Sequence, residues 1–126
     1  MYDLIIIGSG PAGLAAAIYA VRARLNCLIL EKEAVSGGQV INTYEVDNYP
    51  GLPGINGFDL SVKFREHAEN LGAEFRMENV QSLQLDDPVK KVITSKNTYE
   101  TKTVLIATGA EWKKLGVKGE EKLQGM

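Results

Sequence analysis

Apolar and polar positions near the start of the chain follow the order strand, helix, strand. Two short apolar runs, at residues 3–7 and 27–30, have the length and composition of buried β-strands. Between them, residues from about Pro11 to Ala23 carry an apolar stripe at helical spacing, made of Leu14, Ala17, Ile18 and Val21. This order predicts a βαβ unit, in which a helix joins two parallel strands.

The second half of the chain predicts one more helix, followed by strands. The helix runs from about Phe58 to Leu71, ends at Gly72, and has an apolar stripe of Leu60, Phe64, Ala68 and Leu71. Alternating segments predict strands at residues 80–85, 91–94, 98–102 and 104–108. The last of these is almost continuously apolar, which is typical of a central parallel strand covered on both faces.

Residues 32–57 separate these halves and are rich in glycine and proline. A run of this length is long for a structureless loop in a compact domain, and such loops usually carry function. We therefore expect ligand-binding residues within it.

The segment Gly8-Ser9-Gly10-Pro11-Ala12-Gly13 connects the first strand to the first helix. Gly8 allows a sharp turn, Gly10 leaves room for a pyrophosphate beside the backbone, and Gly13 allows the helix to pack closely. Pro11 suits the first helical turn because its fixed φ is helical. The free N–H groups at the helix start make an anion site. The motif therefore predicts dinucleotide binding.

Glu31 strengthens this interpretation because it closes the second strand, 18 residues after Gly13. Its carboxylate can accept hydrogen bonds from both ribose hydroxyls and would repel a 2′-phosphate. The ligand is therefore expected to be of the FAD or NAD type, not NADP. The alternative is that the glycines only make a tight turn in an α/β protein without a ligand.

Composition narrows the class of protein. The 126 residues suit a single domain, and 44% hydrophobic with 24% charged residues is ordinary for a globular protein. A net charge of −2 with mixed signs argues against nucleic-acid binding. No apolar stretch is long enough to span a bilayer, and a strand beginning at Tyr2 leaves no room for a signal peptide. We therefore expect a cytoplasmic protein without a membrane segment.

Neither Cys27 nor His67 is a strong catalytic candidate. Cys27 is the only cysteine, so the chain can form no internal disulfide and no C-x-x-C pair. Its place in a buried strand favours a small hydrophobic role over a reactive thiol. His67 lies beside the apolar stripe of the second helix with no evident nucleophile or carboxylate partner, which favours a solvated or structural role.

Four segments together carry a resemblance to a known family. They are GSGPAG at 8–13, GGQ at 37–39, VDNYPG at 46–51, and IATGA at 106–110 followed by VKGEE from Val117. In order and spacing the chain resembles the N-terminal FAD-binding segment of the low-molecular-weight thioredoxin reductase family, within the pyridine-nucleotide disulfide oxidoreductase superfamily. The resemblance implies an α/β, Rossmann-like FAD-binding domain with a parallel sheet, flanking helices and a small β-meander.

The resemblance also implies which residues bind FAD. The glycine segment would hold the pyrophosphate, Glu31 the adenosine ribose with Lys32 beside it, and a backbone group of Val80 the adenine. Gln39 and Asn48 would lie near the isoalloxazine ring, where side-chain amides can both donate and accept. The complete implied set is Gly8, Ser9, Gly10, Pro11, Ala12, Gly13, Glu31, Lys32, Gly38, Gln39, Thr43, Asn48, Val80, Thr108 and Gly109. Ordinary turn chemistry is the alternative reading of the loop glycines, Asn48 and Pro50.

The family pattern extends beyond these 126 residues, because it continues with an NADPH-binding domain carrying a C-x-x-C dithiol and then a second FAD segment. Residues 1–126 are therefore expected to be an incomplete FAD-binding domain, with apolar surface of the last strand left exposed. The intact enzyme would pass electrons from NADPH through FAD to a dithiol and then to thioredoxin or a similar protein, as a homodimer. Ferredoxin- or flavin-dependent reductases, and a stand-alone FAD- or NAD-binding module without turnover, remain alternatives.

Overall fold

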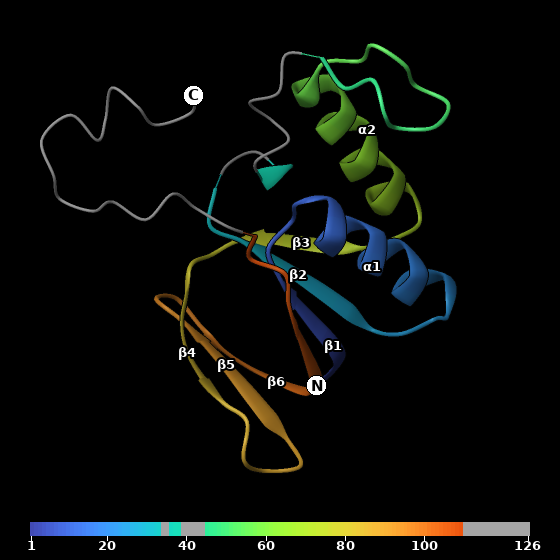
Figure 1. Cartoon of the computed structure of the whole chain (residues 1–126). Coiled ribbons are helices and arrows are strands. Elements are labelled where there is room, and N and C mark those ends of the chain that lie inside the picture. The colour runs from blue at the N-terminus through green and yellow to red at the C-terminus, as the bar shows by residue number, and fades with distance from the viewer. Residues whose placement is uncertain (34–35, 39–44, 110–126) are drawn as a thin grey trace, which may run out of the picture.

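A computed structural model describes residues 1–33, 36–38 and 45–109 of the chain. Figure 1 shows two helices lying over one face of a twisted sheet, and a hairpin-like extension at one end of that sheet. In chain order the elements are β1 (Tyr2–Ile7), α1 (Pro11–Arg22), β2 (Cys27–Glu31), α2 (Gly57–Asn70), β3 (Glu74–Met77), β4 (Val80–Gln84), β5 (Lys90–Thr94) and β6 (Thr98–Ile106). The described residues thus form an α/β domain with a mixed sheet.

The sheet has six strands in the order β3-β2-β1-β6-β5-β4. The pairs β1–β2, β1–β6 and β2–β3 are parallel, and β4–β5 and β5–β6 are antiparallel. The predicted parallel sheet, flanking helices and small β-meander are therefore confirmed. Because β1, β2 and β6 run in the same direction, the segments that follow Ile7, Glu31 and Ile106 all leave the sheet at one edge.

The core consists of two layers on opposite faces of β1 and β2. On one face, Ile6 and Ile29 pack against buried residues of α1 and against Ala68 of α2. On the other face, strands β5 and β6 of the meander supply Val92 and Tyr99, which cover Ile5, Ile7, Leu28 and Leu30. Alternating side chains of each strand therefore serve different layers, as the pleat of a β-strand requires.

Both predicted helices form within a residue of their expected ends, but their buried stripes differ in detail. In α1, Leu14 and Ala17 are fully buried as predicted, and Ala20 completes the buried stripe where Val21 was expected. In α2, the expected core residue Leu71 is 40% exposed, so this part of the prediction is wrong. Leu71 caps the helix end, where the chain turns away before it can reach the sheet.

The strand predictions need two corrections. The sequence pattern missed β3, a strand of only four residues with two charges, whose pairing with β2 decides its conformation. The segments predicted at 98–102 and 104–108 form one continuous strand, β6, which pairs with β5 in its first half and with β1 over most of its length.

Strand β6 is central in the sheet, yet its carboxyl end is not covered on both faces. Leu105 and Ile106 are 39% and 59% exposed, because the helices and the meander pack mainly over β1 and β2. The expected exposure of apolar surface on this strand is therefore observed. Among the described residues, no helix has both the length and the apolar character needed to cross a bilayer.

Candidate functional site

The glycine segment lies at the edge where β1, β2 and β6 end, and two of its glycines serve close packing. Gly8 has φ +104°, and a Cβ on it would lie 2.2 Å from the carbonyl oxygen of Ala107. A Cβ on Gly13 would lie 2.1 Å from the carbonyl oxygen of Gly8. Side chains at these positions would therefore push apart β1, β6 and the start of α1. The predicted roles of Gly8 and Gly13 fit this geometry.

Gly10 differs, because a Cβ on it would meet no clash. A Cβ on Gly10 would meet nothing closer than the backbone of Gly37 and Gly38, at 3.8 Å. Gly10 is also the N-cap of α1, which has no side-chain cap and no acidic residue in its first turn, with Pro11 directly after it. The first N–H groups of a helix have no partner within the helix. An uncapped helix start of this kind, with glycine backbone beside it, suits an anionic group.

Glu31 lies close to this turn, and its carboxylate already accepts hydrogen bonds from the protein. Its Oε1 accepts from the backbone N–H of Ser9 at 3.0 Å and from the Ser9 hydroxyl at 2.6 Å. Its Oε2 accepts from the backbone N–H of Glu33 at 3.0 Å. An ionised carboxylate has about four acceptor positions, and these hydrogen bonds use three of them. Too few positions are left for Glu31 to accept from both ribose hydroxyls, as the sequence led us to expect.

Two further residues at this site were not identified from the sequence. The hydroxyls of Ser9 and Ser36 lie 2.8 Å apart, and Nη1 of Arg65 donates to the Ser36 hydroxyl at 2.9 Å. Ser9 and Ser36 are buried, with 0% and 4% exposure. Arg65 lies on α2, whose periodicity marks it only as a polar position, so no local signal relates it to the glycine segment.

The glycine-rich loop and the end of β6 meet the same turn. The N–H of Gly37 donates to the carbonyl oxygen of Ser9 at 2.8 Å, and Gly38 lies against Gly10. The N–H of Ala107 donates to the carbonyl oxygen of Ile7 at 2.8 Å, which brings Thr108 beside Gly8. Gly109 follows with φ +73° and open space around it. Lys32 is exposed next to Glu31, and Gln39 and Thr43 lie outside the described residues.

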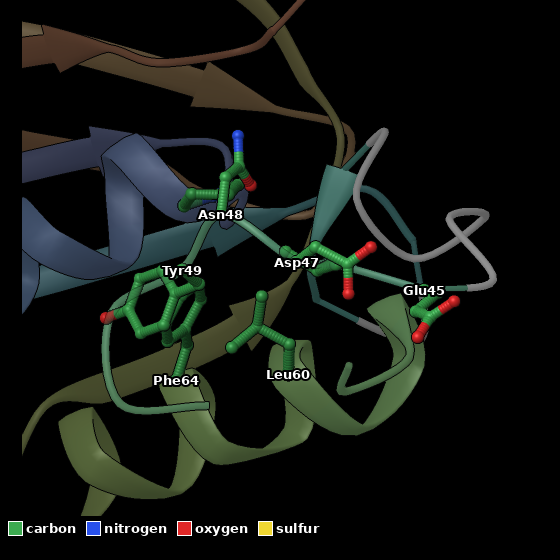
Figure 2. Close-up of a pocket in the computed structure, with 8 residues that line it drawn as sticks. Glu45, Asp47, Asn48, Tyr49, Leu60 and Phe64 are labelled. Atoms are coloured by element: carbon green, nitrogen blue, oxygen red, sulfur yellow. The ribbon is translucent and has the colours of Figure 1, made fainter. Parts of the chain in front are cut away.

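Asn48 borders a pocket of about 320 Å³ between the loop, α1 and α2. The pocket is lined by Pro11, Glu45, Val46, Asp47, Asn48, Tyr49, Leu60 and Phe64. Figure 2 shows Tyr49 lying against Phe64, in an edge-to-face contact with ring centroids 5.1 Å apart, while the Asn48 amide points away from α2. Asn48 is exposed, so its amide is available to a ligand on the α1 side of the loop.

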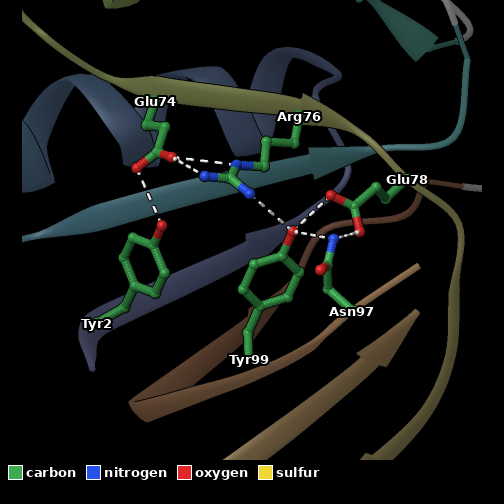
Figure 3. Close-up of polar contacts among 6 residues, drawn as sticks. All are labelled: Tyr2, Glu74, Arg76, Glu78, Asn97 and Tyr99. Carbon is green, nitrogen blue, oxygen red and sulfur yellow. Dashed lines mark hydrogen bonds and ion pairs between the residues drawn. The ribbon is translucent and has the colours of Figure 1, made fainter. Parts of the chain in front are cut away.

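Val80 begins β4, and a cluster of polar side chains lies just before it in the chain (Figure 3). The cluster centres on Glu78, which is 7% exposed. Its carboxylate accepts hydrogen bonds from Thr94 at 2.6 Å, Tyr99 at 2.5 Å and Asn97 at 3.1 Å. Burial opposes the charge, but these three hydrogen bonds outweigh it and hold the pKa of Glu78 below its usual value. This cluster ties the chain before Val80 to the β5–β6 turn.

The structure thus brings together the glycine segment, Glu31, Gly38 and Thr108, with Asn48 and Pro11 around the adjacent pocket. No group of three or more His, Cys, Asp or Glu side chains suited to a metal ion occurs in the described part of the chain. The geometry offers backbone donors at an uncapped helix start, glycine backbone beside them and one structured carboxylate. These features suit an anionic nucleotide and include no general acid–base pair.

Comparison with known proteins decides the family. The sequence model of the pyridine nucleotide-disulphide oxidoreductases matches residues 2–126. The chain belongs to this family. The family member from Listeria monocytogenes named thioredoxin reductase is 46% identical over 125 residues, which make up 99% of this chain and 39% of that protein. The chain therefore spans about 40% of the length of the curated relatives it matches.

Solved structures of family members agree with the fold. The crystal structure of Lactococcus lactis thioredoxin reductase in its FR conformation superposes with a TM-score of 0.90 at 45% identity, covering 97% of this chain and 40% of that one. A ferredoxin-flavin thioredoxin reductase from Clostridium acetobutylicum superposes with a TM-score of 0.83 at 32% identity, covering 98% and 42%. The α/β sheet with its flanking helices is therefore the fold of these reductases, and membership of the family implies a flavin cofactor.

Proposed function

We propose that residues 1–126 are the FAD-binding segment of a thioredoxin-reductase-like flavoprotein that transfers electrons from NADPH to a disulfide. One observation carries the proposal: α1 starts at Gly10 without a side-chain cap, beside the glycine backbone of residues 37–38 and next to a carboxylate at the end of β2. With one cysteine, the chain cannot itself provide the dithiol. The dithiol and the NADPH site would therefore belong to residues outside this sequence.

The residues present fit FAD. Gly10 places no side chain at the start of α1, and the first turn of that helix offers backbone N–H donors without a competing acid. Glu31 suits an unphosphorylated ribose because its negative charge would repel a 2′-phosphate. Asn48 offers an exposed amide, which can donate to and accept from a flavin edge. The family resemblance supports further proposed FAD contacts, which are Gln39, Thr43, Lys32, Val80 and Thr108–Gly109.

The contributions of this chain are binding and orientation. FAD, when bound, supplies the hydride and electron chemistry. The start of α1 would hold the pyrophosphate charge, and Glu31 would orient the ribose. The backbone of Gly37 and Gly38, which lies beside Gly10, would border the pyrophosphate on its other side. We propose no catalytic residue within these 126 residues.

The proposed partners follow from the relatives. Thioredoxin or a similar disulfide protein would be the electron acceptor, and the enzyme would work as a cytoplasmic homodimer. NADPH is the proposed donor. The likeness to a protein named a ferredoxin-flavin thioredoxin reductase makes ferredoxin the donor to test beside it.

The test is FAD binding by the full chain and its Gly10→Ala variant. Gly10 has φ −73°, so alanine is compatible with its backbone, and the new methyl group would make only ordinary contacts, at 3.8 Å from the backbone of the loop. We expect FAD affinity, measured by flavin fluorescence, to fall more than about tenfold while the thermal midpoint stays unchanged.

Two further variants control this experiment. Ser95→Thr adds one methyl group at an exposed turn and should leave binding unchanged. Gly13→Ala should lower stability itself, because its Cβ would collide with the Gly8 carbonyl. Undiminished FAD affinity in a folded Gly10→Ala chain would refute the pyrophosphate assignment.

A further inference from the structure

We propose that Arg65 is a positioning residue for the nucleotide ribose, acting through the hydroxyls of Ser36 and Ser9 to hold the Glu31 carboxylate in one orientation. This inference rests on the proposed function, because it concerns how Glu31 meets a ribose. It assigns a binding role to a residue on α2, which the glycine motif does not include.

The hydrogen bonds from Arg65 through the two serine hydroxyls to Glu31 form a relay. The direction of each bond in the relay follows from the chemistry of the groups at its two ends. An arginine can only donate, and an ionised carboxylate can only accept. Arg65 therefore donates to Ser36 at 2.9 Å, and the single proton of the Ser9 hydroxyl goes to Glu31 at 2.6 Å. The bond between the two hydroxyls, 2.8 Å long, must then use the proton of Ser36. All three bonds point the same way, and aligned hydrogen bonds strengthen one another.

The Arg65 guanidinium is itself held in place from two other sides. Its Nε donates to Glu69 one turn along α2, at 2.5 Å. Its Cζ lies 4.0 Å from the centre of the Phe75 ring on β3, within the range of a cation–π contact. Arg65 thus joins α2, β3 and the loop at Ser36. The buried hydroxyls connect that junction to the end of β2.

The relay determines what Glu31 can offer a ligand. Within the described residues, Oε1 accepts two hydrogen bonds from Ser9, and Oε2 accepts one from Glu33. With about four acceptor positions on a carboxylate, one remains, and it is on Oε2. Glu31 would therefore accept from one hydroxyl of an unphosphorylated ribose. Because the carboxylate is already oriented, binding costs less side-chain entropy.

A purely structural role for Arg65 is the competing explanation, since its contact with Phe75 could simply hold α2 on the sheet. The two explanations differ in how the effects of substitutions at Arg65 and Glu31 on FAD affinity combine. If Arg65 acts through Glu31, removing Arg65 should have no effect once the carboxylate is gone. If Arg65 only supports α2, the two effects should add.

The experiment measures FAD affinity of the full chain in a double-mutant cycle. Arg65→Met keeps an unbranched side chain against Phe75 but removes the donor, and Ser36→Ala breaks the relay at its middle. Each should weaken FAD binding by about five- to tenfold, and the pair no more than either alone. In a Glu31→Gln background, Arg65→Met should change affinity less than about twofold. Lys63→Met, which removes an exposed charge from the same helix, is the matched control.

A second readout needs no ligand. The Ser9 amide donates to Glu31, so its hydrogen exchange reports whether that carboxylate is held. Exchange should become faster in Arg65→Met and Ser36→Ala, and stay unchanged in Lys63→Met. Additive effects on affinity, or unchanged Ser9 exchange in Arg65→Met, would overturn the relay. If neither the unmodified chain nor a longer protein that contains it takes up FAD, the proposed function fails, and the exchange measurement still decides whether the relay exists.

Discussion

At the scale of single residues, the same residue type serves different purposes within a few positions. Gly8 and Gly13 are required because backbone atoms occupy the place of a Cβ, whereas a Cβ on Gly10 would make only ordinary contacts with the backbone of the loop, at 3.8 Å. Gly13→Ala should therefore lower stability, whereas Gly10→Ala should lower FAD affinity and leave stability unchanged. Two carboxylates also differ in their surroundings. Glu31 is partly exposed at the site, whereas Glu78 is buried and accepts hydrogen bonds from three side chains.

Glu78→Gln should lower the stability of the chain at neutral pH and make it less sensitive to acid. The amide would place donors where Thr94, Tyr99 and Asn97 already donate, at a cost of about 1–3 kcal/mol. The folded pKa of Glu78 lies below the value of 4.5 for the free side chain. Its contribution to stability is therefore fully present above pH 4.5 and is lost as the pH falls through the lower, folded pKa.

Urea unfolding between about pH 7 and pH 3 measures both effects. Glu100→Gln makes the same chemical change at an exposed position of β6 and should have little effect. Some acid sensitivity should persist in Glu78→Gln, because hydrogen bonds from Asn26 and Lys102 also lower the pKa of Asp3. Equal pH dependence in Glu78→Gln and the unmodified chain would contradict the account of this cluster.

At the scale of elements, both helices end in the same motif with different residues at its critical position. After α1, the N–H of Arg24 donates to Val21 and that of Leu25 donates to Ala20; after α2, Gly72 donates to Glu69 and Ala73 to Ala68. This is the Schellman arrangement, whose turn residue has positive φ. Gly72 adopts φ +102° freely, whereas Arg24 at φ 63° is a strained choice.

Arg24→Gly should therefore stabilise the chain, by up to about 1 kcal/mol, because glycine avoids the left-handed penalty but loses more backbone entropy on folding. Gly72→Ala is the reciprocal change and should destabilise by a similar amount. Urea unfolding of both variants tests the motif. A destabilised Arg24→Gly chain would show that the arginine side chain makes a contribution larger than the strain.

Element prediction from sequence was accurate where local physics decides the outcome. The limits of α1 follow from Pro11 at its start and the apolar spacing after it, and Gly72 marks the end of α2. Strand β3 was missed because its polar–apolar alternation covers only four residues, too few to stand out from the neighbouring chain. Its backbone is a strand because it pairs with β2. The break predicted near Thr103 is absent because β6 continues from the meander into the parallel sheet.

At the scale of the whole molecule, sheet order assembles the site. The parallel strands β1, β2 and β6 deliver the glycine turn, Glu31 and Thr108 to one edge, although they are far apart in sequence. Open α/β sheets bind ligands at this edge. The same packing buries Cys27 between β1 and the helices, where its exposure is 5%.

Cys27 should report global unfolding. Burial raises its pKa from 9.0 to about 11, so the folded chain near pH 8 contains about 100-fold less thiolate than an ordinary cysteine. We expect slow reaction with a thiol reagent such as DTNB in native buffer and a rate that rises with urea in parallel with unfolding. Cys27 is the sole cysteine, so the signal has one source. Complete labelling within seconds in native buffer would contradict the buried placement.

The sequence by itself determined the βαβ unit, the close-packing roles of Gly8 and Gly13 and the placement of an acid at the end of β2. These features depend on φ angles, spacing and local order, all of which a linear chain carries. Tertiary structure alone decided that Ser36 and Arg65 join Ser9 and Glu31, and that Glu78 meets Tyr99. Those contacts link residues 21 to 29 positions apart. Their partners are chosen by the packing of α2 and the meander on the sheet, which no local pattern encodes.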